Sequence, residues 1–281
     1  MTRSLRIGIS TCPNDTFTFH ALMNGEVSVP GLELEFTLAD VEELNEAMFA
    51  GRLDVAKVSF HAALENAKNI VVLPSGSALG FGVGPVLLGA PGRQHWRADQ
   101  ARRVLAPGRW TTASLLMRLF HPEVDELEHL VFSEIMAELA AGRADYGVCI
   151  HEGRFTWEAA GLSWIEDLGA RFERETASAL PLGGMVAQRR LSQDAQRSVA
   201  LAIRASLQWA RLHPDACLQS MRRFAQEETD DVLWQHVDLY VNEWTSELGD
   251  EGRAALNSLA ELARQRGLLA CGEALHVLEA P

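Results

Sequence analysis

Short apolar runs and helix-like spacing alternate along most of the chain. Residues 5–10, 55–58 and 70–73 are short and apolar, which is typical of buried strands. Residues 32–38 alternate apolar and polar side chains, as a half-buried strand does. Residues 40–50 carry apolar side chains at the three- and four-residue spacing of an amphipathic helix. The pattern predicts an α/β fold in which strands and helices alternate.

The same rhythm continues beyond a glycine-rich segment at residues 74–85. That segment lacks the Lys-Ser/Thr ending of a P-loop and the downstream pattern of the dinucleotide fingerprint, so we expect a loop and no nucleotide site. Helices are expected to run to Phe120 and over residues 133–141. Further strands are expected at residues 85–90, 103–106, 130–132, 144–150, 162–168 and 183–187.

From residue 192 the pattern changes to long amphipathic helices, expected at residues 192–226, 230–248 and 251–266. The first should break near Pro214, because proline in a helix interior removes a hydrogen bond. Nothing in this region suggests an active site. We therefore expect structural roles for its aromatic and histidine residues: Trp209, Trp234, Tyr240, Trp244, His213, His236 and His276.

Composition narrows the class of protein. The 281 residues are 47% apolar and 22% charged, which allows a sizeable core in one large or two ordinary domains. The formal net charge of −13 disfavours a nucleic-acid binder, which needs a positive surface. No apolar run is long enough to span a bilayer, and no secretory signal is recognisable, so a cytoplasmic protein without a membrane partner is expected.

The four cysteines form no Cys-x-x-Cys pair and lie in apolar or small-residue surroundings. That arrangement disfavours a disulfide framework and a structural zinc site, so buried thiols are expected at Cys12, Cys149, Cys217 and Cys271. No His or carboxylate cluster has the spacing of metal ligands either. We expect no metal.

His151 is the first candidate for chemistry. It follows the apolar run 144–150 directly, at the carboxyl end of an expected strand, where ligands sit in open α/β sheets. Histidine has an unperturbed pKa of about 6.5, which suits proton transfer near neutral pH. Glu152 and Arg154 make the following loop polar. The alternative is a loop or helix-cap histidine with no chemistry.

Two helix starts are candidates for anion binding. Asn14 and Asp15 precede a helix expected at residues 16–24, and Thr111 and Thr112 stand at the start of the helix that runs to Phe120. The first N–H groups of a helix have no partner within it and can bind a carboxylate or phosphate. Simple capping explains the same residues equally well at both places.

One short internal echo suggests two similar halves. Residues 50–54 read Ala-Gly-Arg-Leu-Asp and residues 141–145 read Ala-Gly-Arg-Ala-Asp, and an expected strand comes after each. Two α/β halves built alike would present both strand ends to one cleft. Residues 57–59 and His151 would then face a common ligand. Coincidence is the alternative for so short a match.

Five segments, taken in order, resemble the 1,4-dihydroxy-6-naphthoate synthases of the futalosine route to menaquinone. They cover residues 12–17 (Cys-Pro-Asn-Asp-Thr-Phe), 57–62 (Lys-Val-Ser-Phe-His-Ala), 73–80 (Leu-Pro-Ser-Gly-Ser-Ala-Leu-Gly), 107–113 (Pro-Gly-Arg-Trp-Thr-Thr-Ala) and 150–156 (Ile-His-Glu-Gly-Arg-Phe-Thr). Each motif alone is weak, but five in the same order are specific. The likeness covers nearly the whole chain.

The resemblance implies an α/β, two-domain fold similar to type II periplasmic binding proteins, with a ligand cleft between the domains and C-terminal helices. We expect a larger domain of residues 1–88 plus 188–281 and a smaller domain of residues 89–187. Binding proteins of that fold are normally exported. A chain without a recognisable export signal fits an enzyme that kept the cleft and works in the cytoplasm.

The resemblance also implies a lyase that converts cyclic dehypoxanthinylfutalosine to 1,4-dihydroxy-6-naphthoate and releases dihydroxyacetone. It implies no cofactor and a small carboxylated substrate, and it leaves the oligomeric state open. Two alternatives stay open, chorismate dehydratase of the same route and a non-catalytic solute-binding protein. The implied catalytic base is His151, and the implied substrate contacts are Lys57, Val58, Ser59, Thr111, Thr112 and Ala113, to which we add Asn14 and Asp15 on physical grounds.

Overall fold

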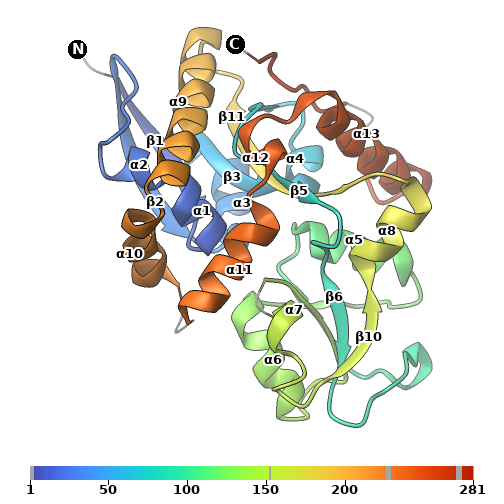
Figure 1. Cartoon of the computed structure of the whole chain (residues 1–281). Helices are drawn as coiled ribbons and strands as arrows, with labels where there is room; N and C mark the ends of the chain where they lie inside the picture. The colour runs from blue at the N-terminus through green and yellow to red at the C-terminus, as the bar shows by residue number, and fades with distance from the viewer. Residues whose placement is uncertain (1–2, 152, 226–228, 270–273, 281) are drawn as a thin grey trace.

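A computed structural model of the chain describes residues 3–151, 153–225, 229–269 and 274–280. It contains two β-sheets with helices packed around them (Figure 1). The first sheet has the strand order β2-β1-β3-β11-β4, and β5 pairs with β11 beside this path. Its strands are β1 (Arg3–Ser10), β2 (Leu32–Ala39), β3 (Val55–Ser59), β4 (Ile70–Val72), β5 (Ala78–Gly80) and β11 (Leu180–Gln188).

The second sheet has the order β10-β6-β9-β7-β8. Strands β7, β8 and β9 run parallel to their neighbours in this group, while β6 is antiparallel to β9 and to β10. The expected alternation of strands and helices is therefore confirmed in both sheets. The strands of the second sheet are β6 (Val86–Gly89), β7 (Val104–Pro107), β8 (Glu128–Leu130), β9 (Tyr146–Cys149) and β10 (Ser163–Asp167).

The helices of the two sheet regions are short. They are α1 (Pro13–Thr18), α2 (His20–Met23), α3 (Val41–Phe49), α4 (Phe60–Glu65), α5 (Thr112–Phe120), α6 (Phe132–Ala140), α7 (Gly153–Thr156), α8 (Leu168–Thr176) and the 3-10 turn η1 (Ala98–Gln100). The C-terminal helices are α9 (Gln193–Leu212), α10 (Pro214–Phe224), α11 (Asp230–Tyr240), α12 (Glu243–Ser246) and α13 (Gly249–Gln265). The predicted break at Pro214 is confirmed, since α10 begins there with proline at its first position.

Several expected elements differ from the structure. The helix expected at residues 16–24 is two short helices: α1 begins at Pro13, because proline is favoured in the first turn of a helix, and ends at Thr18, and α2 begins at His20. The helix expected over residues 230–248 ends at Tyr240, and Asn242 caps the separate helix α12. Strand β8 ends at Leu130, so residues 131–132 belong to the start of α6. The glycine-rich loop contains the short strand β5.

The chain crosses from one sheet to the other at positions that differ from the expected domain boundaries. Strand β6 pairs within the second sheet and β11 within the first, so the boundaries expected at 88/89 and 187/188 fall inside strands. The chain segments that link the sheets meet at Gly84 and Gly169. A Cβ atom on Gly84 would lie 2.2 Å from the Cα of Gly169, so only glycine allows this close approach.

The hydrophobic core is continuous between the sheets. One buried cluster contains Val58 of β3, Leu115 of α5, Tyr146 of β9 and Leu259 of α13. We call the part of the molecule built around the first sheet the first half and the part built around the second sheet the second half. Helix α5 contacts α4, α13 and β11, all of which pack in the first half. The start of α5 is therefore held firmly against the first half, which fixes one wall of the space between the sheets.

Candidate active site

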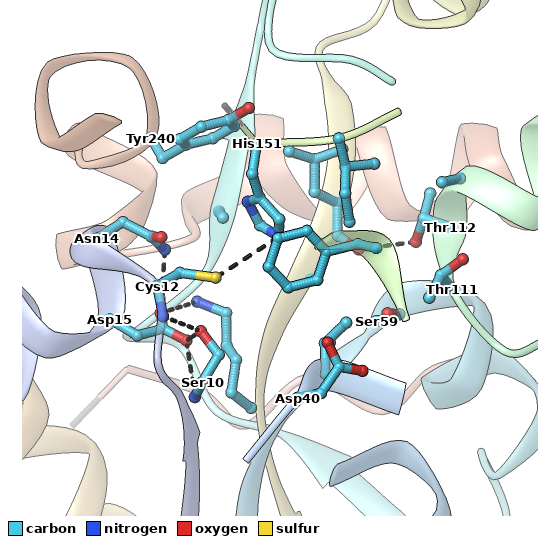
Figure 2. A pocket seen from close by; sticks show the side chains of 18 of the residues that line it. Ser10, Cys12, Asn14, Asp15, Asp40, Ser59, Thr111, Thr112, His151 and Tyr240 are labelled. Atoms are coloured by element: carbon cyan, nitrogen blue, oxygen red, sulfur yellow. Dashed lines mark hydrogen bonds and ion pairs between the residues drawn. The ribbon is translucent and has the colours of Figure 1, made fainter. Parts of the chain in front are cut away.

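A pocket lined by residues of both halves lies between the two sheets. The ends of β1, β3 and β9 and the start of α5 contribute to its walls (Figure 2). Every site residue predicted from the sequence lines this pocket: Asn14, Asp15, Lys57, Val58, Ser59, Thr111, Thr112, Ala113 and His151. The roles of these residues remain predictions.

His151 stands just beyond the carboxyl end of β9 and points into the pocket (Figure 2). Its Nε2 lies 3.6 Å from Cys12 Sγ across the pocket. Its ring packs edge-on against Phe132 at 5.0 Å and stacks on His236 at 5.3 Å between ring centroids. Its φ of 55° is in the left-handed region that few residues other than glycine adopt. Such an outlier beside a pocket favours a functional role.

Lys57 and Asp15 form a buried ion pair at the base of the pocket. Lys57 Nζ donates to Asp15 Oδ1 at 2.7 Å and to the carbonyl of Gly76 at 3.0 Å. Asp15 also accepts a hydrogen bond from Ser10 Oγ at 2.8 Å. The ammonium group of Lys57 has three protons, so one is left for a ligand.

Asn14 and Asp15 do not cap the first helix, which was one of the two roles expected from the sequence. Cys12 occupies the N-cap position, and Asn14 and Asp15 lie within the first turn. The side-chain amide of Asn14 donates to Asp15 Oδ1 at 3.1 Å. Its Oδ1 atom is buried and has no hydrogen-bond partner among the described residues. That acceptor is free to bind a hydroxyl or N–H group of a ligand.

Ser59 ends strand β3 and starts helix α4 at the opposite side of the pocket floor. Its backbone N–H donates to Asn45 Oδ1 at 2.9 Å, and its Oγ accepts from Asn45 Nδ2 at 3.3 Å. The hydroxyl proton of Ser59 is therefore available to a ligand. Val58 adds apolar surface beside it.

Thr111 is the N-cap of α5, and its Oγ1 accepts from the backbone N–H of Ser114 at 3.2 Å. The Thr112 hydroxyl donates to the carbonyl of Leu182 at 2.7 Å. Each hydroxyl thus serves the protein itself. The backbone N–H groups of Thr112 and Ala113 lie in the first turn and have no partner within the helix. An anion here would be bound by these amides more than by the hydroxyls.

Glu42 links the two walls of the pocket. Its carboxylate, from α3 of the first half, accepts from the backbone N–H of Arg109 at 2.7 Å and of Trp110 at 2.9 Å. Gly108 adopts a φ of 75°, and a Cβ there would lie 2.7 Å from the Glu42 carboxyl carbon. Burial raises the pKa of Glu42. These contacts hold the segment before α5 in place.

Helix α11 contributes to the site, contrary to the expectation from the sequence. Tyr240 lines the pocket, and His236 lies fully buried behind His151. Desolvation by burial is the main cause that holds the pKa of His236 well below the ordinary value, and the nearness of His151 acts in the same direction. The sequence signal was the four-residue spacing of His236 and Tyr240, which places both on one helix face. Cys12, Asp40 and Phe132 also line the pocket and were not predicted.

Other aromatic residues of the C-terminal helices pack as expected. Trp209 stacks between His20 and the exposed His213, and Trp234 packs edge-on against Phe17. Cys12, Cys149 and Cys217 are buried and form no disulfide. The predictions for Cys271 and Glu152 concern positions outside the described residues.

Neither a metal centre nor a membrane span is found within the described ranges. They hold no group of three or more His, Cys, Asp or Glu side chains arranged to bind a metal ion. They also hold no helix whose length and apolar character would let it cross a bilayer.

Comparison with known proteins assigns the family. A sequence profile described as "Menaquinone biosynthesis" (VitK2_biosynth) matches residues 5–265. The chain belongs to this family. Two members named 1,4-dihydroxy-6-naphtoate synthase are similar to it over 95% of its length. The protein of Thermus thermophilus is 41% identical with 96% of its own chain covered, and that of Streptomyces coelicolor is 39% identical with 95% covered. The resemblance inferred from the five motifs is confirmed.

Solved structures define the fold of this menaquinone-biosynthesis family member. Protein AF1704 from Archaeoglobus fulgidus has a TM-score of 0.87 at 29% identity and covers 95% of this chain and 98% of its own. The periplasmic aliphatic sulphonate binding protein SsuA from Escherichia coli has a TM-score of 0.63 at 13% identity, covering 96% and 90%. The expected fold similar to periplasmic binding proteins is confirmed.

Proposed function

We propose that this chain is a carbon–carbon lyase of menaquinone biosynthesis that forms 1,4-dihydroxy-6-naphthoate from cyclic dehypoxanthinylfutalosine and releases dihydroxyacetone. Two relatives named for this product, each similar over 95% of the chain, support the proposal. The observation that carries it is His151 Nε2, which faces a pocket between the sheets whose opposite wall is the start of α5. In this proposal His151 acts as the base on one side of the ligand, and the first turn of α5 binds the anionic group of the ligand on the other.

In the proposed reaction, neutral His151 accepts a proton from the carbon skeleton of the substrate. The spiro ring system opens, and the bond to the sugar-derived fragment breaks. The fragment leaves as dihydroxyacetone, and the remaining bicycle becomes aromatic. Aromatisation supplies much of the driving force, so the step needs a base and oxyanion donors but no redox cofactor. A positioned base of this kind contributes about 10²–10⁴-fold in rate.

Substrate orientation is set by the polar groups that remain available. The substrate carboxylate binds the backbone N–H groups of Thr112 and Ala113 at the start of α5, a helix of nine residues. Asn14 Oδ1 accepts from a substrate hydroxyl, and Ser59 Oγ donates to an oxygen on which negative charge develops. Val58 and Tyr240 add apolar surface for the bicycle. A small carboxylated substrate and a cytoplasmic location stay predictions.

The deciding experiment incubates the purified protein with cyclic dehypoxanthinylfutalosine and, separately, with chorismate, and monitors both by mass spectrometry. We expect 1,4-dihydroxy-6-naphthoate and dihydroxyacetone from the first and no conversion of the second. Water loss from chorismate would instead indicate a chorismate dehydratase. Tight binding without conversion of either would indicate a solute-binding protein.

The role of His151 is tested by His151→Ala. We expect turnover to fall by at least about 10²–10⁴-fold, while calorimetry still detects substrate binding. His213→Ala is the matched control, because His213 is exposed on the C-terminal helices and outside the pocket. Near-normal turnover of His151→Ala would reject His151 as the base.

A further inference from the structure

Cys12 and His151 meet across the pocket from different halves of the molecule (Figure 2). Cys12 precedes α1, beside the end of β1, while His151 comes after β9 in the second sheet. The distance of 3.6 Å between Sγ and Nε2 is that of a hydrogen bond to sulfur. The proposed lyase reaction does not use this thiol, so its contact with His151 needs a separate explanation.

A thiol beside an imidazole has a defined reactivity. The thiolate is the nucleophile, and a neighbouring base that takes the thiol proton is the usual way to activate a cysteine. His151 Nε2 lies within hydrogen-bond distance of Sγ, and it can accept the thiol proton in the tautomer that leaves Nε2 unprotonated. Cys12 is 9% exposed and lines the pocket.

A second observation points to a ligand at this place. Asn14, two residues from Cys12, is 8% exposed and lines the same pocket, and its buried Oδ1 has no partner among the residues described. An unpaired buried acceptor of this kind is costly unless a ligand uses it. Phe132 and Tyr240 provide aromatic surface nearby. The combination fits a flat aromatic ligand that carries hydroxyl groups.

We propose that Cys12 is a covalent modification site for 1,4-naphthoquinones, the oxidised form of a 1,4-dihydroxynaphthoate. The choice of this electrophile rests on the proposed function, whose product is a hydroquinone. Dioxygen converts such a hydroquinone to the quinone by taking two electrons and two protons, and is itself reduced to hydrogen peroxide. A quinone formed from the product has the shape that the pocket is proposed to hold.

The addition balances without another reagent. His151 accepts the proton of Cys12, and Sγ forms a bond to an unsubstituted carbon of the quinone ring. The electron pair of sulfur reduces the ring, so one carbonyl becomes an enolate. His151 returns its proton to that oxygen, and the hydrogen on the attacked carbon moves to the second oxygen. The result is a thioether of the hydroquinone, fixed in the pocket and blocking it.

Thiol reactivity is tested first with iodoacetamide on the full-length protein, with the labelling of each cysteine measured by peptide mass spectrometry. Cys149 and Cys217 are internal controls, at 2% and 0% exposed, and burial raises the pKa of Cys217 to about 12. We expect Cys12 to react at least about ten-fold faster than either. Equal rates at Cys12 and Cys217 would overturn the proposal, and this comparison needs no variant.

The contribution of His151 is tested with His151→Phe, which keeps a ring against Phe132 but cannot take a proton. We expect labelling of Cys12 to slow by about ten-fold or more while labelling of Cys217 is unchanged. A parallel rise at Cys217 would report unfolding, and His151→Gln then serves as the second variant. An unchanged rate at Cys12 in a folded variant would overturn the pairing.

Selectivity for quinones is tested with 1,4-naphthoquinone as the probe. We expect one quinone per chain on Cys12, a larger preference for Cys12 over Cys217 than iodoacetamide shows, and no adduct in Cys12→Ser. Alkylation of Cys12 by iodoacetamide but not by the quinone would overturn the assigned electrophile. An adduct in a protein that forms no dihydroxynaphthoate would overturn the proposed function and leave the site intact.

Discussion

The turns that lead into β3 and β9 have the same geometry although they belong to different sheets. Gly51 and Gly142 come after the helices α3 and α6 with φ angles of 67° and 66°. In both turns the next residue donates its N–H to a carbonyl five residues earlier, at 2.9 Å for Arg52 and 3.0 Å for Arg143. The repeat in the sequence therefore corresponds to the same helix–turn geometry before β3 and before β9, which we call the shared frame.

The aspartates of the two frames also act alike. Asp54 donates its N–H to the carbonyl of Arg6, and its carboxylate accepts from the N–H of Arg6 at 3.0 Å. Asp145 donates to the carbonyl of Arg103 at 3.0 Å and accepts from the N–H of Arg102 at 2.8 Å. Each aspartate thus ties its turn to a neighbouring segment of its own sheet, Arg6 of β1 or the residues just before β7, and so fixes where β3 and β9 begin.

Beyond this shared frame the two halves differ in the strand and in the residue at its end. Strand β3 passes directly into α4 through Ser59, which has an ordinary extended φ of −65°, and it carries the buried cation Lys57. Strand β9 has the apolar Val148 at the matching place and leads into the strained His151. The shared frame positions the start of each strand. Beyond it, the first half supplies the fixed pocket floor around Lys57, and the second supplies His151.

Removing the buried ion pair between Lys57 and Asp15 at the pocket floor should have the largest effect on stability. Lys57→Met leaves the Asp15 carboxylate buried without its cation, which typically costs about 3–5 kcal/mol. Val148→Met, at the matching place in the second half, removes no ion pair and should cost less, about 1–3 kcal/mol from overpacking. Urea unfolding of both variants measures the difference.

The double variant Asp15→Asn with Lys57→Met is the control for this prediction. It removes the unpaired charge, so it should recover much of the stability lost in Lys57→Met. If Lys57→Met unfolds at the same urea concentration as the wild type, the ion pair does not hold the floor.

A buried histidine stands just after the end of β3, and acid should destabilise the fold through it. His61, in the first half, is buried and contacts the Thr111 carbonyl at 3.2 Å; desolvation lowers its pKa to about 4. Since its ordinary pKa is about 6.5, the unfolded chain binds a proton that the folded chain refuses between those values. Stability is fully present above pH 6.5 and is lost as the pH falls toward 4, by an amount on the order of 3 kcal/mol.

His61→Asn removes this titration and should flatten the pH dependence of the unfolding free energy between pH 7 and pH 4. The buried His236 acts in the same direction, so some dependence will remain. His213→Asn is the control, because His213 is exposed. A pH dependence identical in His61→Asn and wild type would contradict the assignment.

Sequence and structure agree where the determining interactions are local. The strands were visible as apolar runs, and His151 was found because it directly succeeds one of them. The role of Tyr240 was missed, because α11 reaches the pocket only through packing that joins distant parts of the chain. The left-handed conformation of His151 was not predicted either, although histidine adopts it more often than most other non-glycine residues. The N-cap at Cys12 could have been read from Pro13, which marks a first helical position.

The shared frame itself predicts matched effects from its two aspartates. Asp54→Ala and Asp145→Ala each leave backbone N–H groups and arginines without their acceptor, which costs about 1–3 kcal/mol. Asp54 should show the larger loss, because its side chain is 9% exposed compared with 17% for Asp145. Thermal unfolding of both variants tests the match, and a loss in only one of them would mean that the repeat has no common structural role.

The smallest stability effect is expected at His236, which lies on α11 behind His151. Both ring nitrogens of His236 are buried without a partner in the residues described, so His236→Phe should keep the stack on His151 and leave stability unchanged or raise it by about 1 kcal/mol. Turnover should nevertheless fall by about ten-fold, because the imidazole on which His151 stacks is replaced by a ring of different polarity beside the base. His20→Phe is the matched control: His20 also stacks at 5.3 Å, on Trp209, but its Nδ1 bonds Ser220 Oγ at 2.8 Å, so that variant should lose stability and keep turnover. A loss of stability in His236→Phe with normal turnover would reduce His236 to a packing residue and leave Phe132 as the ring that orients His151.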